Sequence, residues 1–177
     1  MAGERPIVIV SNRGPVSYRF DGDGVPQARR GAGGLVSGLA PLVRHTDTRW
    51  LAAAMSDADR AASVAGATEA EGFRVHLLAF EPDVWRAHYD TVCNEALWFA
   101  HHGLFHPVYE PAWPAGWMDE AWAAYRTVHE GFARAVVADA PEGAAATAAA
   151  EDLATPEPAA PPSEPATFIT IKRATKP

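Results

Sequence analysis

The segment that decides the fold of this chain is residues 30–40, RGAGGLVSGLA, a cluster of glycines leading into a helical pattern. Glycines at such a junction let the backbone approach a ligand closely, and the free N–H groups at a helix start attract anions. A phosphate or sugar phosphate would suit this position. Without further context, a tight turn that needs positive φ is the commoner explanation. The spacing is neither G-x-G-x-x-G, since Val36 stands where a glycine is required, nor a P-loop.

A short, continuously apolar run precedes this segment at residues 6–10, PIVIV. Its β-branched residues favour a strand buried on both faces of a parallel sheet. A polar turn follows at residues 11–15, at the carboxyl end of that strand, where ligands bind in open α/β sheets. Arg13 in this turn could hold a phosphate through two hydrogen bonds. An exposed arginine in a surface loop is about as common an explanation.

Strand and helix patterns then alternate. Residues 16–20 and 25–28 flank Asp-Gly repeats and predict a hairpin. The next helix is predicted to place Leu35, Val36, Leu39, Leu42 and Val43 on one face and to be kinked or shortened by Pro41. Residues 49–54 and 73–80 predict two further strands. This alternation predicts a doubly wound α/β layer.

Two helical patterns rich in aromatic residues follow. The first, from residue 84 to 100, carries Trp85, Tyr89, Val92, Ala96 and Leu97 at helical spacing. The second, residues 118–138, places Trp122, Tyr125, Val128, Phe132 and Val136 on one face. Helical aromatic residues usually belong to a core, so spacing alone favours a core position over a ligand contact for Tyr89 and Trp98.

Three histidines near the end of the first aromatic helix invite comparison with a metal site. His102 and His106 are four residues apart, but Gly103 and Pro107 oppose a regular helix there. No H-E-x-x-H pattern is present either. We therefore expect His101, His102 and His106 to form a cluster at a helix end, and we predict no metal ligand.

Composition limits the classes of function. A net charge of −7 and a pI near 5.4 argue against a general nucleic-acid or anionic-membrane surface. Cys93 is the single cysteine and cannot form an internal disulfide. The N-terminal residues show no secretory signal, and no apolar run is long enough to span a bilayer. These features predict a soluble, cytoplasmic protein.

The last quarter of the chain changes character. Residues 139–166 are mostly Ala, Pro, Glu and Thr, a composition typical of a disordered linker, so no strand is expected to follow the helix that ends at residue 138. Residues 167–177 form a short tail, in which TFITIKR could make one strand without an obvious partner or serve as a basic tag. Residues 1–138 are thus the expected folded part.

Three motifs in order resemble the opening motifs of the trehalose-6-phosphate synthases. They are IVSNR at residues 9–13, GGLVSGL at residues 33–39 and YDTVCNEALW at residues 89–98. The resemblance covers roughly residues 6–138. It implies a partial Rossmann-like N-terminal domain, on the acceptor side of a GT-B glycosyltransferase, followed by the disordered tail. The activity it implies is transfer of glucose from UDP- or GDP-glucose to glucose 6-phosphate in trehalose biosynthesis, with no cofactor and no obligatory metal.

The resemblance also implies roles for individual residues. By position, Arg13, Tyr89 and Trp98 match residues that bind the acceptor sugar phosphate. Gly33 and Gly34 fall in the glycine motif whose backbone lies against the donor diphosphate. The implied partners are therefore two small molecules, a nucleotide sugar and glucose 6-phosphate. A homo-oligomer or a complex with a full-length synthase stays open.

The chain departs from the family pattern in two places. Ala53 stands where the family shows the second tryptophan of a W-x-G-W run that contacts the acceptor, which leaves other sugar or cyclitol phosphates open as acceptors. The family's His-Asp-Tyr-His strand and its later Arg-Lys pair do not follow Ala138. We therefore expect a fragment of a synthase that has no catalytic residue and is inactive alone. The alternative is a stand-alone sugar-phosphate-binding or regulatory module.

Overall fold

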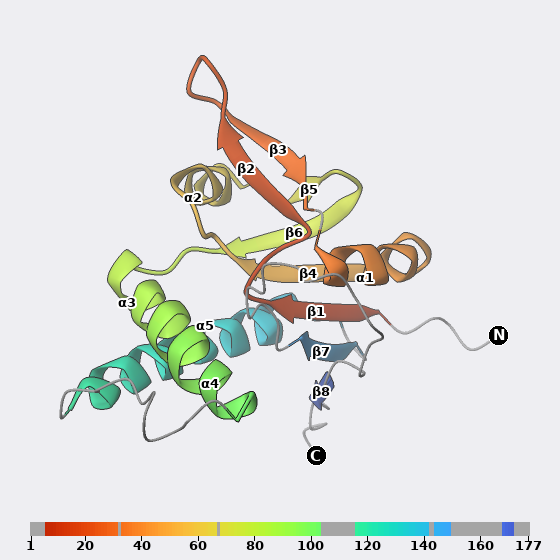
Figure 1. Ribbon diagram of the computed structural model, residues 1–177. Helices are drawn as coiled ribbons and strands as arrows, with labels where there is room; N and C mark the ends of the chain where they lie inside the picture. The colour runs from red at the N-terminus through yellow and green to blue at the C-terminus, as the bar shows by residue number, and fades with distance from the viewer. Residues whose placement is uncertain are drawn as a thin grey trace. The chain divides into compact units, whose positions relative to one another are not determined.

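A computed structural model of the chain describes residues 6–31, 33–66, 68–103, 116–141, 144–149 and 168–171 (Figure 1). The chain divides into two compact units. The sheet unit comprises Met1–Ala79, Arg134–Glu151 and Pro162–Pro177, and the helical unit comprises Phe80–Ala133 and Asp152–Pro161.

The sheet unit is built on one mixed sheet with the strand order β5-β6-β4-β1-β7-β8. Its four inner strands are parallel: β6 (Phe73–Leu78), β4 (Thr48–Ala53), β1 (Ile7–Ser11) and β7 (Ala145–Ala149). Antiparallel β5 (Glu69–Ala70) and β8 (Phe168–Ile171) border them. The predicted α/β layer is confirmed. Because β4 and β7 pair with opposite sides of β1, the direction of winding reverses there, which is where α/β sheets bind ligands.

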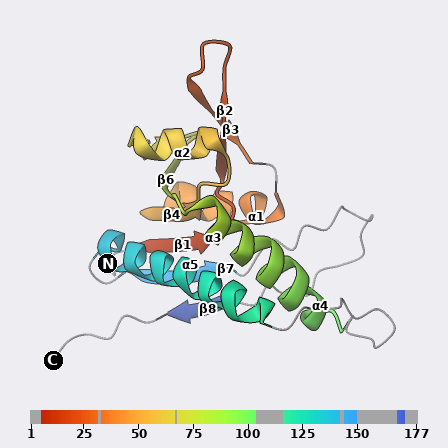
Figure 2. The ribbon, with the colours of Figure 1, turned by 90° about the vertical axis from the view of Figure 1, so that its left-hand side faces the viewer.

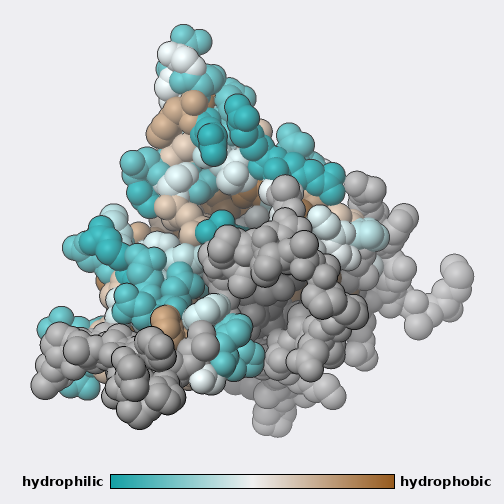
Figure 3. Space-filling model, in the orientation of Figure 1, coloured by the Kyte–Doolittle hydropathy of each residue, from teal (hydrophilic) through white to brown (hydrophobic). Residues whose placement is uncertain are grey.

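One face of the sheet is covered by two helices and a hairpin. These are α1 (Gly34–His45), α2 (Asp57–Val64) and the pair β2 (Val16–Phe20) and β3 (Pro26–Arg30), which rises past α2 in Figures 1 and 2. Ile9, Trp50 and Val75 from three neighbouring strands form the centre of the buried cluster beneath them. Hydrophilic residues dominate the face of the hairpin and α2 that is seen in Figure 3.

Asp59 ties the hairpin to α2. Its side chain completes a capping box with Ser56 at the helix start and also accepts a 2.7 Å hydrogen bond from the backbone N–H of Tyr18 in β2. Helix α1 continues through Pro41 to His45, so of the two effects expected of this proline, a kink or a shorter helix, the shortening does not occur. Val36 and Ala40 supply its buried face, and the side chains of Leu35 and Leu42 lie outside the described part.

A strand stands where none was predicted. Strand β7 pairs with β1 in parallel, with Ala146 opposite Val8, and the N–H of Ala145 donates to the carbonyl of Pro6 at 3.0 Å. The prediction failed because a sheet edge offers backbone donors and acceptors to any extended segment, even one of low β-propensity. Of the two alternatives left open for residues 167–173, a strand or a basic tag, the structure has the strand, β8, and β7 is its partner. The rest of the predicted linker, residues 150–166, lies outside the described residues.

The helical unit contains α3 (Pro82–Arg86), η1 (Ala87–Leu97), α4 (Trp98–His101) and α5 (Trp117–Asp139), whose last residues belong to the sheet unit. Element η1 is a π-helix, which corrects the regular helical spacing expected there. Looser winding buries His88, Tyr89, Val92 and Ala96 and leaves Leu97 41% exposed. Trp122 on α5, expected in the core, is also exposed.

Gly131 lets α5 approach Phe80 closely. A Cβ atom at residue 131 would lie 2.6 Å from Cε1 of Phe80, far inside van der Waals contact. That ring is confined in turn, because it stacks on Trp85 with centroids 6.0 Å apart and packs against Phe132 at 5.6 Å. The glycine is thus required by packing.

We predict that Gly131→Ala destabilises the protein by about 1–3 kcal/mol, the usual cost of overpacking. Gly38→Ala is the control, since Gly38 lies in α1 with no described atom within 4 Å of the added methyl group, and it should stabilise by about 0.5–1 kcal/mol. Denaturant unfolding measures both. Equal effects from the two substitutions would contradict the packing argument.

Candidate functional site

The turn after β1, residues 11–15, is held at successive backbone positions. The Ser11 hydroxyl donates to the carbonyl of Arg13 at 2.6 Å, and the carbonyl of Asn12 accepts from the N–H of Ala53 at 3.1 Å. A Cβ atom on Gly14 would lie 3.1 Å from that of Ala52, so the turn is pressed against β4. Arg13 itself is exposed. The structure therefore places Arg13 on a hydrogen-bonded turn at the carboxyl end of β1.

The glycine cluster lies next to this turn. The hairpin pairs Val16 with Arg30, and just beyond that pair the N–H of Gly31 donates to the carbonyl of Pro15 at 2.8 Å. Helix α1 begins three residues later, with Gly33 as its N-cap. Arg13 thus lies just before the first strand of the hairpin, and Gly33 and Gly34 lie just after its second strand.

The backbone conformation at Gly33 and Gly34 does not require glycine. Gly33 has a φ of −68°, and Gly34 has no positive φ either, so a tight left-handed turn does not account for them. A Cβ atom on either glycine would meet no described atom within 4 Å. The first turn of α1 has no acidic residue to offset the partial positive charge of the helix start. An anion could therefore approach this backbone closely.

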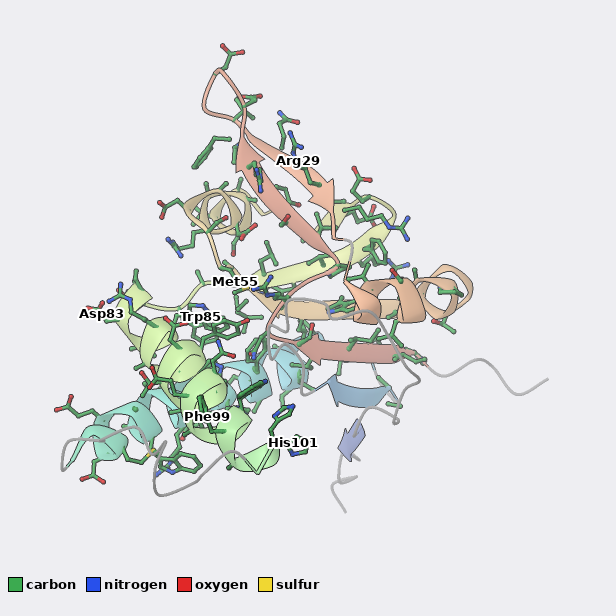
Figure 4. The ribbon with its side chains drawn as sticks, viewed as in Figure 1. Arg29, Met55, Asp83, Trp85, Phe99 and His101 are labelled. Carbon is green, nitrogen blue, oxygen red and sulfur yellow. The ribbon has the colours of Figure 1, made fainter. Side chains whose placement is uncertain are left out.

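The two predicted aromatic ligands lie within the helical unit. Tyr89 is buried on η1 and stacks on Trp85, with centroids 5.4 Å apart. Trp98 is half-buried at the start of α4 and stacks on His102 at 4.4 Å. Figure 4 labels Trp85, Phe99 and His101, which lie on the helical segment α3–η1–α4 that also carries Tyr89 and Trp98. Tyr89 is thus a core residue, as spacing alone favoured, while Trp98 keeps part of its ring accessible.

The π-helix changes how Tyr89 and Trp98 are related. Nine residues make about two and a half turns of a regular α-helix, which would put the two rings on opposite sides. Bonding from i to i+5 takes up more residues per turn, so a separation of nine approaches two whole turns. Element η1 therefore brings Tyr89 and Trp98 toward one face.

His88 is a buried residue that the sequence analysis missed. It is 1% exposed, its ring contacts Trp85, Tyr125 and His129, and its Nε2 lies 3.8 Å from Sγ of Cys93. Burial, helped by the nearby His129, lowers the pKa of His88 to about 4. The sequence does carry a signal for this position. His88 lies four residues before Val92 and eight before Ala96, a spacing that matches the wider winding of η1.

Burial also controls the other titratable groups of this cluster. It raises the pKa of Cys93 to about 11, so the thiol stays protonated and is a poor nucleophile at neutral pH. The pKa of His129 is lowered and that of Tyr125 is raised, again mainly by burial. At neutral pH the cluster is therefore uncharged and serves packing.

The histidines near residue 101 do not form a metal site within the described residues. Nδ1 of His102 lies 2.8 Å from the carbonyl oxygen of Trp98, which ties this side chain to the helix end. No group of three metal-ligating side chains occurs in the described ranges, and His106 lies outside them. Among the helices that can be described, none has the length and apolar character needed to cross a bilayer.

A cavity of about 370 Å³ lies elsewhere in the sheet unit, lined by residues that include Arg49, Arg74, His76 and Asp139. Arg49 and Arg74 are second residues of their strands, so the cavity lies toward the amino ends of β4 and β6. Its charges are engaged within the protein: Arg49 donates to the Asp139 carbonyl at 2.6 Å, and the Asp139 carboxylate contacts His76. The cavity is therefore distinct from the turn that carries Arg13.

Comparison with known proteins places this arrangement in a family. The model of glycosyltransferase family 20 matches residues 5–147, from the residue before Pro6 into β7. The chain belongs to glycosyltransferase family 20. The match includes β1, the glycine cluster and both aromatic helices, and it extends past the boundary expected at residue 138.

Curated relatives agree with this family. A trehalose-6-phosphate synthase from Mycolicibacterium smegmatis is 30% identical over 145 residues, which are 81% of this chain and 26% of that protein. An alpha,alpha-trehalose-phosphate synthase [UDP-forming] from Botryotinia fuckeliana is 28% identical over 81% of this chain and 27% of its own length. A second such enzyme from Aspergillus niger is 30% identical over 80% of this chain. The chain spans about a quarter of the length of these relatives.

We predict that acid destabilises the helical unit through His88. Its pKa is near 6.5 when unfolded and about 4 when folded, so between these values the unfolded chain binds more protons. The stabilisation that results from keeping His88 neutral is fully present above pH 6.5. About 3 kcal/mol of the free energy of unfolding is lost as the pH drops to 4.

Denaturant unfolding at a series of pH values measures this slope. His88→Gln should flatten it, because a neutral amide cannot take up the proton. His101→Gln is the control, since His101 is exposed on α4, and it should leave the slope unchanged. An identical slope in the wild type and in His88→Gln would contradict the role of His88.

Proposed function

We propose that this chain carries the acceptor-side part of a trehalose-6-phosphate synthase. Such an enzyme transfers glucose from a nucleotide sugar, UDP- or GDP-glucose, to glucose 6-phosphate. The names of the relatives support the reaction, two of them with the words "UDP-forming". The observation that carries the proposal is the position of Arg13, an exposed cation on a fixed turn where the winding of the sheet reverses.

Arg13 is proposed to bind the phosphate of the acceptor. A guanidinium presents parallel N–H donors that match a phosphate in two-point hydrogen bonding, and its charge persists at any physiological pH. The turn is already held by the Ser11 hydroxyl and by Ala53, so little conformational freedom is lost on binding. This favours a tight, oriented contact.

The start of α1 is proposed to bind the donor diphosphate. The N–H groups of the first helical turn have no partners within the helix, and no acidic side chain lies near them in that turn. Gly33 and Gly34 leave open space around this backbone. In the reaction, such donors stabilise the negative charge that develops on the leaving diphosphate.

Tyr89 and Trp98 are proposed to contact the acceptor sugar. Their placement toward one side of the π-helix supports a joint role, with the half-buried ring of Trp98 offering a face to the apolar side of a hexose. Tyr89 is buried against Trp85, so its contribution would come from the edge of the ring and from holding the helix in place.

The acceptor need not be glucose 6-phosphate. Ala53, the residue that replaces the family's second tryptophan, is the last residue of β4 and is 3% exposed. Its N–H holds the carbonyl of Asn12, so it lies directly behind the turn that carries Arg13. An alanine there leaves out one large ring that would contact the acceptor, which favours a site that tolerates related hexose phosphates.

We predict that the full 177-residue chain binds glucose 6-phosphate and that Arg13→Ala weakens binding roughly 10- to 100-fold, the value of a charged hydrogen-bond pair. Isothermal titration calorimetry measures this, with fructose 6-phosphate and inorganic phosphate as comparison ligands. Arg19→Ala on β2 is the matched control, since it removes another exposed arginine of the sheet unit. A folded wild type that binds no hexose phosphate would contradict the proposal.

A second measurement tests whether this chain transfers glucose by itself. The family's later Arg-Lys pair has no counterpart in these 177 residues, so we expect the isolated chain to bind without transferring glucose from UDP- or GDP-glucose. Release of nucleotide diphosphate in the presence of both substrates measures transfer. Turnover that Arg13→Ala abolishes would show that this chain is catalytic by itself and would refute the expectation.

A further inference from the structure

A buried hydrogen-bond chain runs from the core to the arginine turn. Nε1 of Trp50 donates to the Ser11 hydroxyl at 2.8 Å, and that hydroxyl lies 2.6 Å from the carbonyl oxygen of Arg13. Trp50 is 1% and Ser11 3% exposed, so the bond between them is buried, while the bond to Arg13 is partly buried. The chain links the middle of β4 to the backbone of the turn.

The direction of both bonds follows from chemistry. An indole N–H can only donate, and a carbonyl oxygen can only accept. The Ser11 hydroxyl must therefore accept from Trp50 and give its single proton to Arg13. Without the indole N–H, the hydroxyl could rotate to other partners and the Arg13 carbonyl would lose a fixed donor.

Trp50 is held in place at the core end of this hydrogen-bond chain. It lies in β4, paired with Ile9 of β1 on one side and Val75 of β6 on the other. Its ring meets that of Phe73 edge to face, with centroids 6.2 Å apart. The Arg30 guanidinium lies over the Phe73 ring at 5.3 Å. The indole therefore has little freedom to move.

We propose that Trp50 and Ser11 are positioning residues that set the orientation of Arg13 and thereby its affinity for a sugar phosphate. This inference rests on the proposed function of Arg13. Backbone hydrogen bonds hold the turn at Asn12 and Pro15, and a side-chain hydroxyl holds the carbonyl of Arg13. Loss of that tie should loosen the one residue whose direction matters.

Three substitutions test this without touching Arg13. Trp50→Phe keeps an aromatic ring against Phe73 and removes the indole N–H, Ser11→Ala removes the hydroxyl, and Ser11→Thr retains it. We expect Trp50→Phe and Ser11→Ala each to weaken glucose 6-phosphate binding about 5- to 20-fold in calorimetry, the range of a lost hydrogen bond. The double variant should bind glucose 6-phosphate no more weakly than the weaker-binding single variant, because both changes break the same chain of hydrogen bonds. Ser11→Thr should bind as the wild type does.

Ser63→Ala is the matched control. The Ser63 hydroxyl donates to the carbonyl of Leu77 at 2.7 Å, a similar side-chain hydrogen bond in the same unit that is not made to a residue of the turn. Its loss should lower stability and leave affinity unchanged. Wild-type affinity in Trp50→Phe and Ser11→Ala, together with loss of binding in Arg13→Ala, would overturn the inference while the proposed function stands.

A measurement without ligand keeps the two proposals separable. Nitrogen-15 relaxation of the Arg13 and Gly14 amides should show a rigid turn in the wild type and lower order parameters in Trp50→Phe and Ser11→Ala, but not in Ser63→Ala. Unchanged order parameters in the first two variants would refute the positioning role. If the wild type binds no sugar phosphate, the proposed function fails, and relaxation still decides whether Trp50 and Ser11 hold the turn.

Discussion

Backbone pairing on both sides of β1 is the constraint on which the sheet unit depends. With β4 on one side and β7 on the other, β1 is the strand where the winding changes direction. The loops that follow such a strand separate from their neighbours and leave room for a ligand. The position of Arg13 follows from this topology, since it is the second residue after β1. A strand at the sheet edge would not provide the same opening.

Glycines serve two opposite purposes around this strand. Gly14 and Gly31 have little room for a side chain, because an added Cβ atom would lie 3.1 Å from Cβ of Ala52 and 3.3 Å from the carbonyl oxygen of Pro15, respectively. Gly33 and Gly34 leave space that the described protein atoms do not fill. The first pair brings the turn and the hairpin base together, while the second pair leaves the start of α1 accessible. Close packing and an open helix start thus use the same residue type for different reasons.

The helical unit depends on neutral packing around His88. A π-helix is rare because its bonding is less favourable than that of an α-helix, so it needs compensation from side-chain contacts. The rings of Trp85 and Tyr125, both tilted against His88, and the edge-on ring of His129 provide such contacts. Its lowered pKa follows from the same burial. The geometry that turns Tyr89 and Trp98 toward one side is therefore linked to a buried histidine that must stay uncharged.

Local patterns in the sequence determined much of this protein. The apolar run before Arg13 predicted β1, the Asp-Gly repeats predicted the hairpin, and the glycine cluster predicted the start of α1, because each depends on neighbours in the chain. Only tertiary structure decided the rest. β7 exists because β1 offers it backbone partners, and the bond from Trp50 to Ser11 joins residues that lie 39 positions apart. The period of 3.6 residues of a regular helix did not predict the π-helix, because contacts with α5 stabilise the wider winding of η1.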